Sequence, residues 1–253
     1  MSSANLKHTA YLSMLVDHFF AVVFWAYITY LKAQGQPWSD MYTVYRIGRA
    51  IGRIAFILFA FMIVEGFLHT RSQGKYLLRL GIFALLSEIP FDLAINGEVF
   101  TMKGQNVYFT LFLGVMALYF WKTLKGRPVM QFAGAALCCM LAALLKTDYM
   151  FMGVMLILVF YLCRKSFWLQ FVVGSVTIYV GIVLVYVVRY YGQGIPFTTL
   201  LKSGRSELYG LLAFILIYFY NGQKGKQLPK ACYYLFYPIH LLLLYGMKRW
   251  FFG

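Results

Sequence analysis

Residues 9–31 read TAYLSMLVDHFFAVVFWAYITYL, an apolar run that is interrupted by Asp17 and His18. A helix that crosses a bilayer needs about 20 mainly apolar residues, so this run predicts a membrane span. It is too long for the apolar part of a signal peptide and lacks a small-residue cleavage pattern, so we expect it to be retained. Its two ionisable residues must face the protein interior, because exposing either of them to lipid is costly.

The composition of the whole chain is that of a membrane protein. Of its 253 residues, 62% are hydrophobic and 12% are charged, against about 45–50% and 25% in soluble domains. Further apolar runs predict spans near 50–68, 76–95, 106–122, 129–146, 149–164, 167–189, 207–220 and 231–247. The fold class is therefore all-α, a polytopic integral membrane helical bundle of about nine spans, with eight to ten left open. The runs lack the alternation of β-barrel strands.

The connections between these runs are short, so residues 1–253 are expected to form one domain. Polar loops are expected at 32–49 and 190–206, and the second leaves room for a re-entrant or interfacial piece. The net charge of +15 comes from basic residues scattered between apolar runs. That distribution favours loops that contact anionic lipid headgroups and argues against nucleic-acid binding. Lysine and arginine are nearly balanced between the two sides, with a small excess that favours a cytoplasmic N-terminus.

The four cysteines predict neither a disulfide framework nor a metal site. Cys138, Cys139, Cys163 and Cys232 all lie in apolar stretches, without the paired spacing or the nearby histidines of a zinc site. They are expected to be small core residues.

Asp17 and His18 form the first candidate site. Adjacent residues of a helix point about 100° apart, so we expect each side chain to meet a partner on another helix. Histidine takes up a proton near neutral pH, and a nearby carboxylate can fix its tautomer, which together suit general-base chemistry. The alternative is a hydrogen-bonded pair that only joins helices.

An arginine stripe opens the second predicted span. Spacings of three and four residues place Arg46, Arg49 and Arg53 on one helical face, while Gly48 and Gly52 allow close approach of another backbone or a ligand. Guanidinium groups suit phosphate or carboxylate recognition. Contact with headgroups, combined with small-residue helix packing, is the alternative.

A charged hairpin follows the second span. Glu65 and His69 are four residues apart and can meet on one face, and Arg71, Lys75 and Arg79 repeat at intervals of four. This basic rim suits the phosphates of a soluble cofactor, and it equally fits an ordinary cytoplasmic loop.

Three further polar residues stand at span ends or within a span. Asn106 and Asp148 open spans, where such residues commonly cap helices. Pro238 is expected to kink the final span, and His240 lies among leucines inside it, a position that in lipid favours a functional role. We expect the final span to pack beside the first two, around one polar cavity that holds Asp17, His18, Arg53, Glu65 and His240.

Several blocks, taken in order, resemble the TraX family. They are MLVDH at 14–18, IGRIAFILFAF at 51–61, EGFLHTR at 65–71, KYLLRL at 75–80, SEIPFD at 87–92, NVYFTL at 106–111 and YLFYPIHLLLL at 234–244. The founding activity of that family is acetylation of the N-terminus of a conjugative pilin subunit. The family is also distantly similar to transmembrane acyltransferases, which take the acetyl group from cytoplasmic acetyl-CoA.

The resemblance implies an acetyltransferase of the bacterial inner (cytoplasmic) membrane, with acetyl-CoA as donor and a peptide, pilin or glycan as acceptor. It implies His18 and Asp17 as catalytic residues. It implies cofactor contacts at Arg49, Arg53, Arg71, Lys75 and Arg79. It implies substrate contacts at Glu65, His69, Asn106, Asp148 and His240. Residues 190–206 match nothing in the family pattern, which leaves the acceptor open.

Two rival functions remain at this point. A proton-coupled transporter or permease would use buried Asp, His, Glu and Arg as an ion relay, but inverted repeats are absent from the sequence. A non-catalytic assembly scaffold does not explain so many ionisable groups inside the spans.

Overall fold

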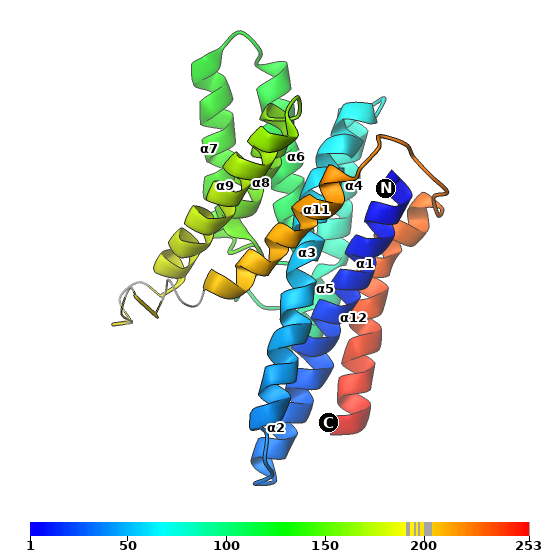
Figure 1. The fold of residues 1–253 in the computed structure, drawn as a ribbon, viewed down its shortest axis with the longest axis vertical. Coiled ribbons are helices and arrows are strands. Elements are labelled where there is room, and N and C mark those ends of the chain that lie inside the picture. Colours follow the sequence, from blue (N-terminus) through cyan, green and yellow to red (C-terminus); the bar gives the residue numbers. More distant parts are fainter. Residues whose placement is uncertain (191–192, 195, 197, 200–203, 253) are drawn as a thin grey trace. The chain divides into compact units, whose positions relative to one another are not determined.

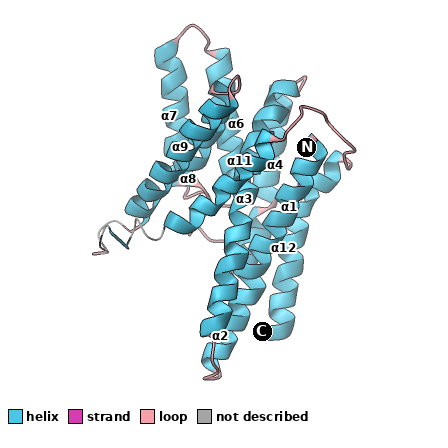
Figure 2. Ribbon diagram, viewed as in Figure 1, coloured by secondary structure: helices cyan, strands magenta, loops and turns pink. Residues whose placement is uncertain are grey.

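The computed structural model describes residues 1–190, 193–194, 196, 198–199 and 204–252. Within these ranges the chain is helical, with no strand (Figure 2). The elements are α1 (Ser3–Phe19), η1 (Phe20–Phe24), α2 (Trp25–Ala33), α3 (Ser39–His69), α4 (Gln73–Leu86), α5 (Glu88–Phe91), η2 (Asp92–Asn96), α6 (Val107–Thr123), α7 (Pro128–Leu144), α8 (Met150–Leu162), α9 (Phe167–Arg189), η3 (Gly204–Leu212), α11 (Ala213–Tyr218) and α12 (Lys230–Phe252). Of the three η segments, η1 and η2 are π-helical and η3 is a 3₁₀ helix.

The helices confirm the all-α architecture that the apolar runs predict, since every predicted span overlaps a helix, and their apolar length is consistent with a membrane protein. Among the described residues, three helical stretches are long and apolar enough to cross a membrane: Ser3–Ala33, Ser39–His69 and Phe167–Val188. Helices α6, α7 and α8 are shorter but also apolar. The number of spans stays a prediction.

The prediction of a loop at 32–49 is wrong for residues 39–49, which are helical. Helix α3 begins at Ser39 and carries Asp40 in its first turn, where a carboxylate stabilises the positive end of the helix dipole. The arginine stripe is therefore entirely helical. The re-entrant piece expected within 191–206 falls largely outside the described residues.

The chain divides into two compact units. The first unit comprises 1–58, 86–101 and 209–253, and the second comprises 59–85 and 102–208. The expectation of a single domain stays a prediction.

In the first unit, α12 packs along the continuous helix formed by α1, η1 and α2 (Figure 1). The ring of Tyr11 stacks on Tyr233 at 5.5 Å, and the ring of Tyr27 contacts Phe252 at 6.0 Å. The early residues of the first helix thus contact the early residues of α12, and the late residues contact the late ones, so the two helices run in the same direction. The short elements α5 and η2 also pack against α12.

Helix α3 runs antiparallel to the first helix. The Ser13 hydroxyl donates to the Ile51 carbonyl at 2.7 Å, and further along the ring of Trp25 lies 5.2 Å from Tyr45. Every polar group of these helices that is buried requires such a partner, because lipid offers none.

Hydrogen bonds outside the regular helices hold two segments of the first unit, the start of α1 and the segment around η2. The backbone N–H of Ser3 donates to Gln223 O at 2.7 Å, and that of Ala4 donates to Lys224 O at 2.9 Å. At the start of η2, the fully buried Asp92 carboxylate accepts from Asn96 Nδ2 at 2.9 Å and from Thr101 N at 2.7 Å. These bonds tie the start of α1 to residues 223–224 and tie η2 to the segment that follows it.

The second unit contains a bundle in which α6 packs on α7 and α8, and α8 packs on α7 and α9. Close helix approach depends on glycine, because a Cβ added at Gly114 would overlap Ile157, and one added at Gly181 would overlap Met152. The hydroxyls of Thr110 and Thr147 are fully buried and bond to each other at 2.9 Å.

Candidate functional site

Asp17 is paired with two arginines of α3. Its Oδ2 accepts from Arg49 Nη1 at 2.7 Å, and its Oδ1 lies 4.0 Å from Arg53 Nη2. The side chains are 16% exposed for Asp17 and Arg53 and 25% for Arg49. A carboxylate in the middle of an apolar helix is thereby neutralised. Oδ1 makes no hydrogen bond within the described part of the chain.

Two glycines of α3 make this approach possible. A Cβ added at Gly52 would overlap the Asp17 carboxylate, and one added at Gly48 would overlap the ring of Phe20. The close approach expected at these glycines is confirmed, and the groups that approach belong to α1 and η1.

His18 meets His240 of α12. Its Nδ1 lies 2.7 Å from His240 Nε2, and the two rings stack with centroids 5.0 Å apart and planes 14° apart. On the far side of the second ring, His240 Nδ1 lies 2.7 Å from the Phe236 carbonyl oxygen. A carbonyl, an imidazole and a second imidazole therefore form one hydrogen-bonded row.

Aromatic side chains surround the row. Tyr237 is 2% exposed and presents its ring edge-on to His18 at 5.8 Å and to His240 at 5.6 Å. The ring of Phe236 stacks on His240 at 4.9 Å. Directly after His18, the helix widens into η1, and such π-helical turns are frequent at functional sites.

The structure confirms that Asp17 and His18 each meet a partner on another helix. It also confirms that α12 packs beside the first of the two helices expected next to it, while packing of α12 against the second, α3, stays a prediction. The group that bonds to His18 is the imidazole of His240, whereas the carboxylate of Asp17 bonds to Arg49. Five predicted site residues thus come together in the first unit: Asp17, His18, Arg49, Arg53 and His240. Their catalytic, cofactor-binding and substrate-binding roles stay predictions, as does a cavity among them.

Glu65 and His69 lie in the second unit, about three turns beyond Arg53 along α3. His69 Nδ1 is 2.9 Å from Glu65 O and 4.0 Å from Glu65 Oε2, so the predicted meeting on one face is confirmed. The His69 side chain is 72% exposed. A place for Glu65 in the polar cavity stays a prediction.

The basic rim also lies in the second unit. Arg71 precedes α4, and Lys75 and Arg79 lie one turn apart within it. The first two residues are exposed, while the half-buried Arg79 carries a buried Nε that has no hydrogen-bond partner among the described residues. The spacing suits a multiply charged anion, and cofactor binding here stays a prediction.

Asn106 caps α6, as its sequence position predicts. Its Oδ1 accepts from Tyr108 N at 2.9 Å, and its Nδ2 donates to Ala84 O at 2.8 Å, so the amide joins α6 to α4. Asp148 is exposed and precedes Tyr149, which is the N-cap residue of α8. The predicted substrate roles of both residues are left untested by these contacts.

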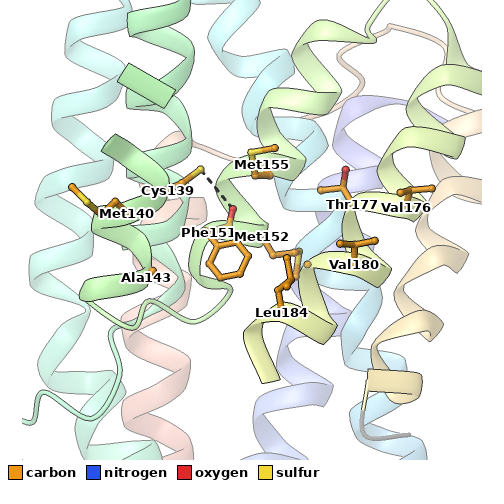
Figure 3. A pocket seen from close by; sticks show the side chains of 11 residues that line it. Cys139, Met140, Ala143, Phe151, Met152, Met155, Val176, Thr177, Val180 and Leu184 are labelled. Atoms are coloured by element: carbon orange, nitrogen blue, oxygen red, sulfur yellow. Dashed lines mark hydrogen bonds between the residues drawn. The ribbon is translucent and has the colours of Figure 1, made fainter. Parts of the chain in front are cut away.

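A separate pocket of about 590 Å³ lies among α7, α8 and α9 (Figure 3). Its walls are almost wholly apolar, with Met152 and Leu184 among the side chains that project into it. The sulfur of Cys139 lies 4.0 Å from the Phe151 carbonyl. Since no lining residue is a carboxylate or an imidazole, this pocket offers no general base. Among the described residues, no group of three or more His, Cys, Asp or Glu is placed to hold a metal ion.

Two parts of the site were missed by sequence reasoning. The Phe236 carbonyl is a backbone group, and such a role leaves no trace in residue type. Tyr237 stands beside Pro238 in a run rich in tyrosine. Its position three residues before His240 was the sequence signal that could have placed it next to the imidazole.

The chain is similar to known proteins over almost its whole length. A family model described as TraX protein matches residues 2–248. A probable fimbrial assembly protein FimC (serogroup H1) of Dichelobacter nodosus is 28% identical over 265 residues, which cover 98% of this chain and 96% of that protein. No solved structure gives a significant match. Because the family model spans almost the whole chain, the chain belongs to the TraX protein family.

Proposed function

We propose that this protein is a membrane-embedded acetyltransferase that moves an acetyl group from acetyl-CoA to an amine, the N-terminus of a pilin or of a related peptide. The observation that carries the proposal is the His18–His240 pair, a half-buried imidazole whose Nδ1 is engaged by a second, buried imidazole. Membership of the TraX family and the similarity to a fimbrial assembly protein support a function related to pilins.

The reaction needs a base, because an amine attacks only after losing a proton. The N-terminal ammonium first releases one proton to water. As the neutral amine nitrogen bonds to the thioester carbon, His18 takes a second proton from that nitrogen, and the carbon–sulfur bond breaks. The CoA thiolate leaves and takes up the proton from His18, which restores the base. Charge and atoms balance, with one proton released to water for each acetyl group transferred.

The arginines beside Asp17 supply positive charge next to His18. Arg49 is held by the 2.7 Å ion pair with Asp17, so its guanidinium is fixed before substrate arrives. A fixed positive group stabilises the oxyanion that develops on the thioester carbonyl at little cost in reorganisation. Arg71, Lys75 and Arg79 form the part of the second unit best suited to the CoA phosphates.

The activity can be tested with two peptides of the same sequence, one with a free N-terminus and one with a blocked N-terminus. Purified protein in detergent is mixed with radiolabelled acetyl-CoA and either peptide, taken from a pilin of the same cell. We expect label to reach only the peptide with the free amine. Equal labelling of both peptides would move the acceptor to a hydroxyl or a lysine side chain, and absence of acetyl-CoA binding would favour the transporter alternative.

A further inference from the structure

We propose that His240 is a positioning residue that fixes His18 in the tautomer whose free nitrogen is Nε2. The role of that nitrogen as a base rests on the proposed acetyl transfer, but the tautomer itself does not. Two hydrogen-bond contacts and the surroundings of the two rings lead to this assignment.

The first contact fixes the proton on His240. A carbonyl oxygen can only accept a hydrogen bond, and the Phe236 oxygen lies 2.7 Å from His240 Nδ1. The proton of the neutral His240 ring is therefore on Nδ1. Its Nε2 is left with a lone pair and must act as an acceptor.

The second contact passes this constraint to His18. His240 Nε2 and His18 Nδ1 are 2.7 Å apart, a distance that requires one hydrogen between them. Since Nε2 is the acceptor, the hydrogen belongs to His18 Nδ1. The remaining nitrogen of His18, Nε2, then carries the free lone pair.

The surroundings of the two rings keep both imidazoles neutral in the resting protein and hold them in place. A buried charge without a counter-ion is costly, and the nearby carboxylate, Asp17, is already paired with Arg49. His240 is 4% exposed, and Tyr237 packs edge-on against both imidazoles.

The row also helps once His18 has accepted a proton at Nε2. The imidazolium donates from Nδ1 to His240, and His240 in turn donates to the Phe236 carbonyl. Each bond polarises the next, so the row stabilises the positive charge on His18. A residue that fixes the tautomer of a catalytic histidine is worth a large rate factor.

The first test reads the tautomers directly in the resting, full-length protein. The chain has four histidines, so ¹⁵N-histidine labelling gives few ring signals, and each is assigned by a single replacement. At neutral pH in detergent we expect His18 and His240 to be neutral with the proton on Nδ1. A proton on Nε2 of His18 would overturn the proposal, whether or not the protein transfers acetyl groups.

The second test changes the partner. His240→Gln keeps an acceptor for His18 and a donor for the Phe236 carbonyl, whereas His240→Leu removes both at similar size. We expect His240→Leu to lower kcat by about 100-fold or more, to leave KM for acetyl-CoA unchanged and to release His18 into a mixture of tautomers. His240→Gln should restore the tautomer and most of kcat.

The exposed His8 provides the control, and His8→Leu should change neither kcat nor the His18 signal. If His240→Leu kept both the wild-type kcat and the wild-type His18 tautomer, the proposal would be wrong. If it did not fold, the wild-type ¹⁵N signals would still decide. A protein that shows the expected tautomers but transfers no acetyl group would refute the proposed function and leave the positioning role intact.

Discussion

Gly52 of α3 lies directly against the carboxylate of Asp17 on α1, with no room for a side chain between them. The ion pair from Asp17 to Arg49 therefore depends on a glycine one turn away from that arginine. The same contact joins the first two long helices at the level of His18.

Gly52→Ala should break the Asp17–Arg49 pair, because the added methyl group occupies the position of the carboxylate. We expect a loss of about 1–3 kcal/mol in the free energy of unfolding and a fall in acetyl transfer of at least tenfold. Thermal unfolding in detergent and the peptide assay measure the two effects. Gly246→Ala is the matched control, since a Cβ there meets nothing within 4 Å, and it should be harmless. Wild-type behaviour of Gly52→Ala would mean that α1 and α3 pack differently.

The partly buried ion pair between Asp17 and Arg49 should show coupling in a double-mutant cycle. Breaking a fully buried pair costs about 3–5 kcal/mol, and this pair retains some exposure, so Asp17→Asn and Arg49→Gln should each destabilise the protein by less than that. The double variant should be less destabilised than the sum of the two. Denaturant unfolding of all four proteins gives the coupling, and simple additivity would indicate that the pair is solvated.

His18→Ala should abolish acetyl transfer while leaving the protein inserted and acetyl-CoA binding largely intact. The reason is that the ring supplies the proposed base but no part of the contact with the cofactor phosphates. Single-turnover transfer to the free peptide, combined with equilibrium binding of acetyl-CoA, separates the two properties. Near wild-type turnover would move the base to another histidine.

The basic rim should bind the phosphates of CoA. A hydrogen bond to a charged group is worth about 1.5–3 kcal/mol, so Arg71→Ala, Lys75→Ala and Arg79→Ala should each weaken CoA binding by roughly tenfold or more. Titration calorimetry measures the dissociation constants, with Lys125→Ala as an exposed basic control from the same unit. Dephospho-CoA should bind the wild type more weakly and lose less on mutation. Unchanged constants for all three variants would place the cofactor elsewhere.

The parallel course of α1 and α12 makes a topological prediction. If both helices cross the bilayer, their first residues lie on one side and their last residues on the other, so the number of spans from α1 to α12 is odd. In a background with the natural cysteines replaced, cysteines at Asn5 and Lys230 should react with an impermeant reagent from the same side. A cysteine at Trp250 should react from the opposite side. Labelling of all three positions from one side would contradict the packing of α12.

The positions of the helices could be predicted from the sequence because lipid demands long apolar runs, and those runs recur throughout the chain. The need of Asp17 and His18 for partners followed from the same physics. Which groups would satisfy them could not be predicted, since His18 and His240 are 222 residues apart and no periodic pattern links them. The extension of α3 back to Ser39 was missed because its first turns are polar, as is usual for a helix that emerges from the membrane.

The π-helical turns η1 and η2 could not be predicted from the sequence either. A π-helical turn depends on which backbone bonds form, and Phe20–Phe24 has the composition of any apolar helix. The division of the chain into two units was hidden for a related reason, since α3 contributes to both without any break in its pattern.

The pairing of the first helix with the last one has a consequence for biosynthesis. A ribosome adds about 5–20 residues per second, so the 222 residues between the two histidines take about 10–45 s to make. During that time Arg49 is already available to Asp17, whereas His18 has no partner. The ion pair can therefore hold the first helix in place early, whereas the His18–His240 row forms only after α12 has entered the membrane. If that row is the acetyl-transfer site proposed above, a ribosome that stalls before α12 leaves behind an inserted but inactive fragment.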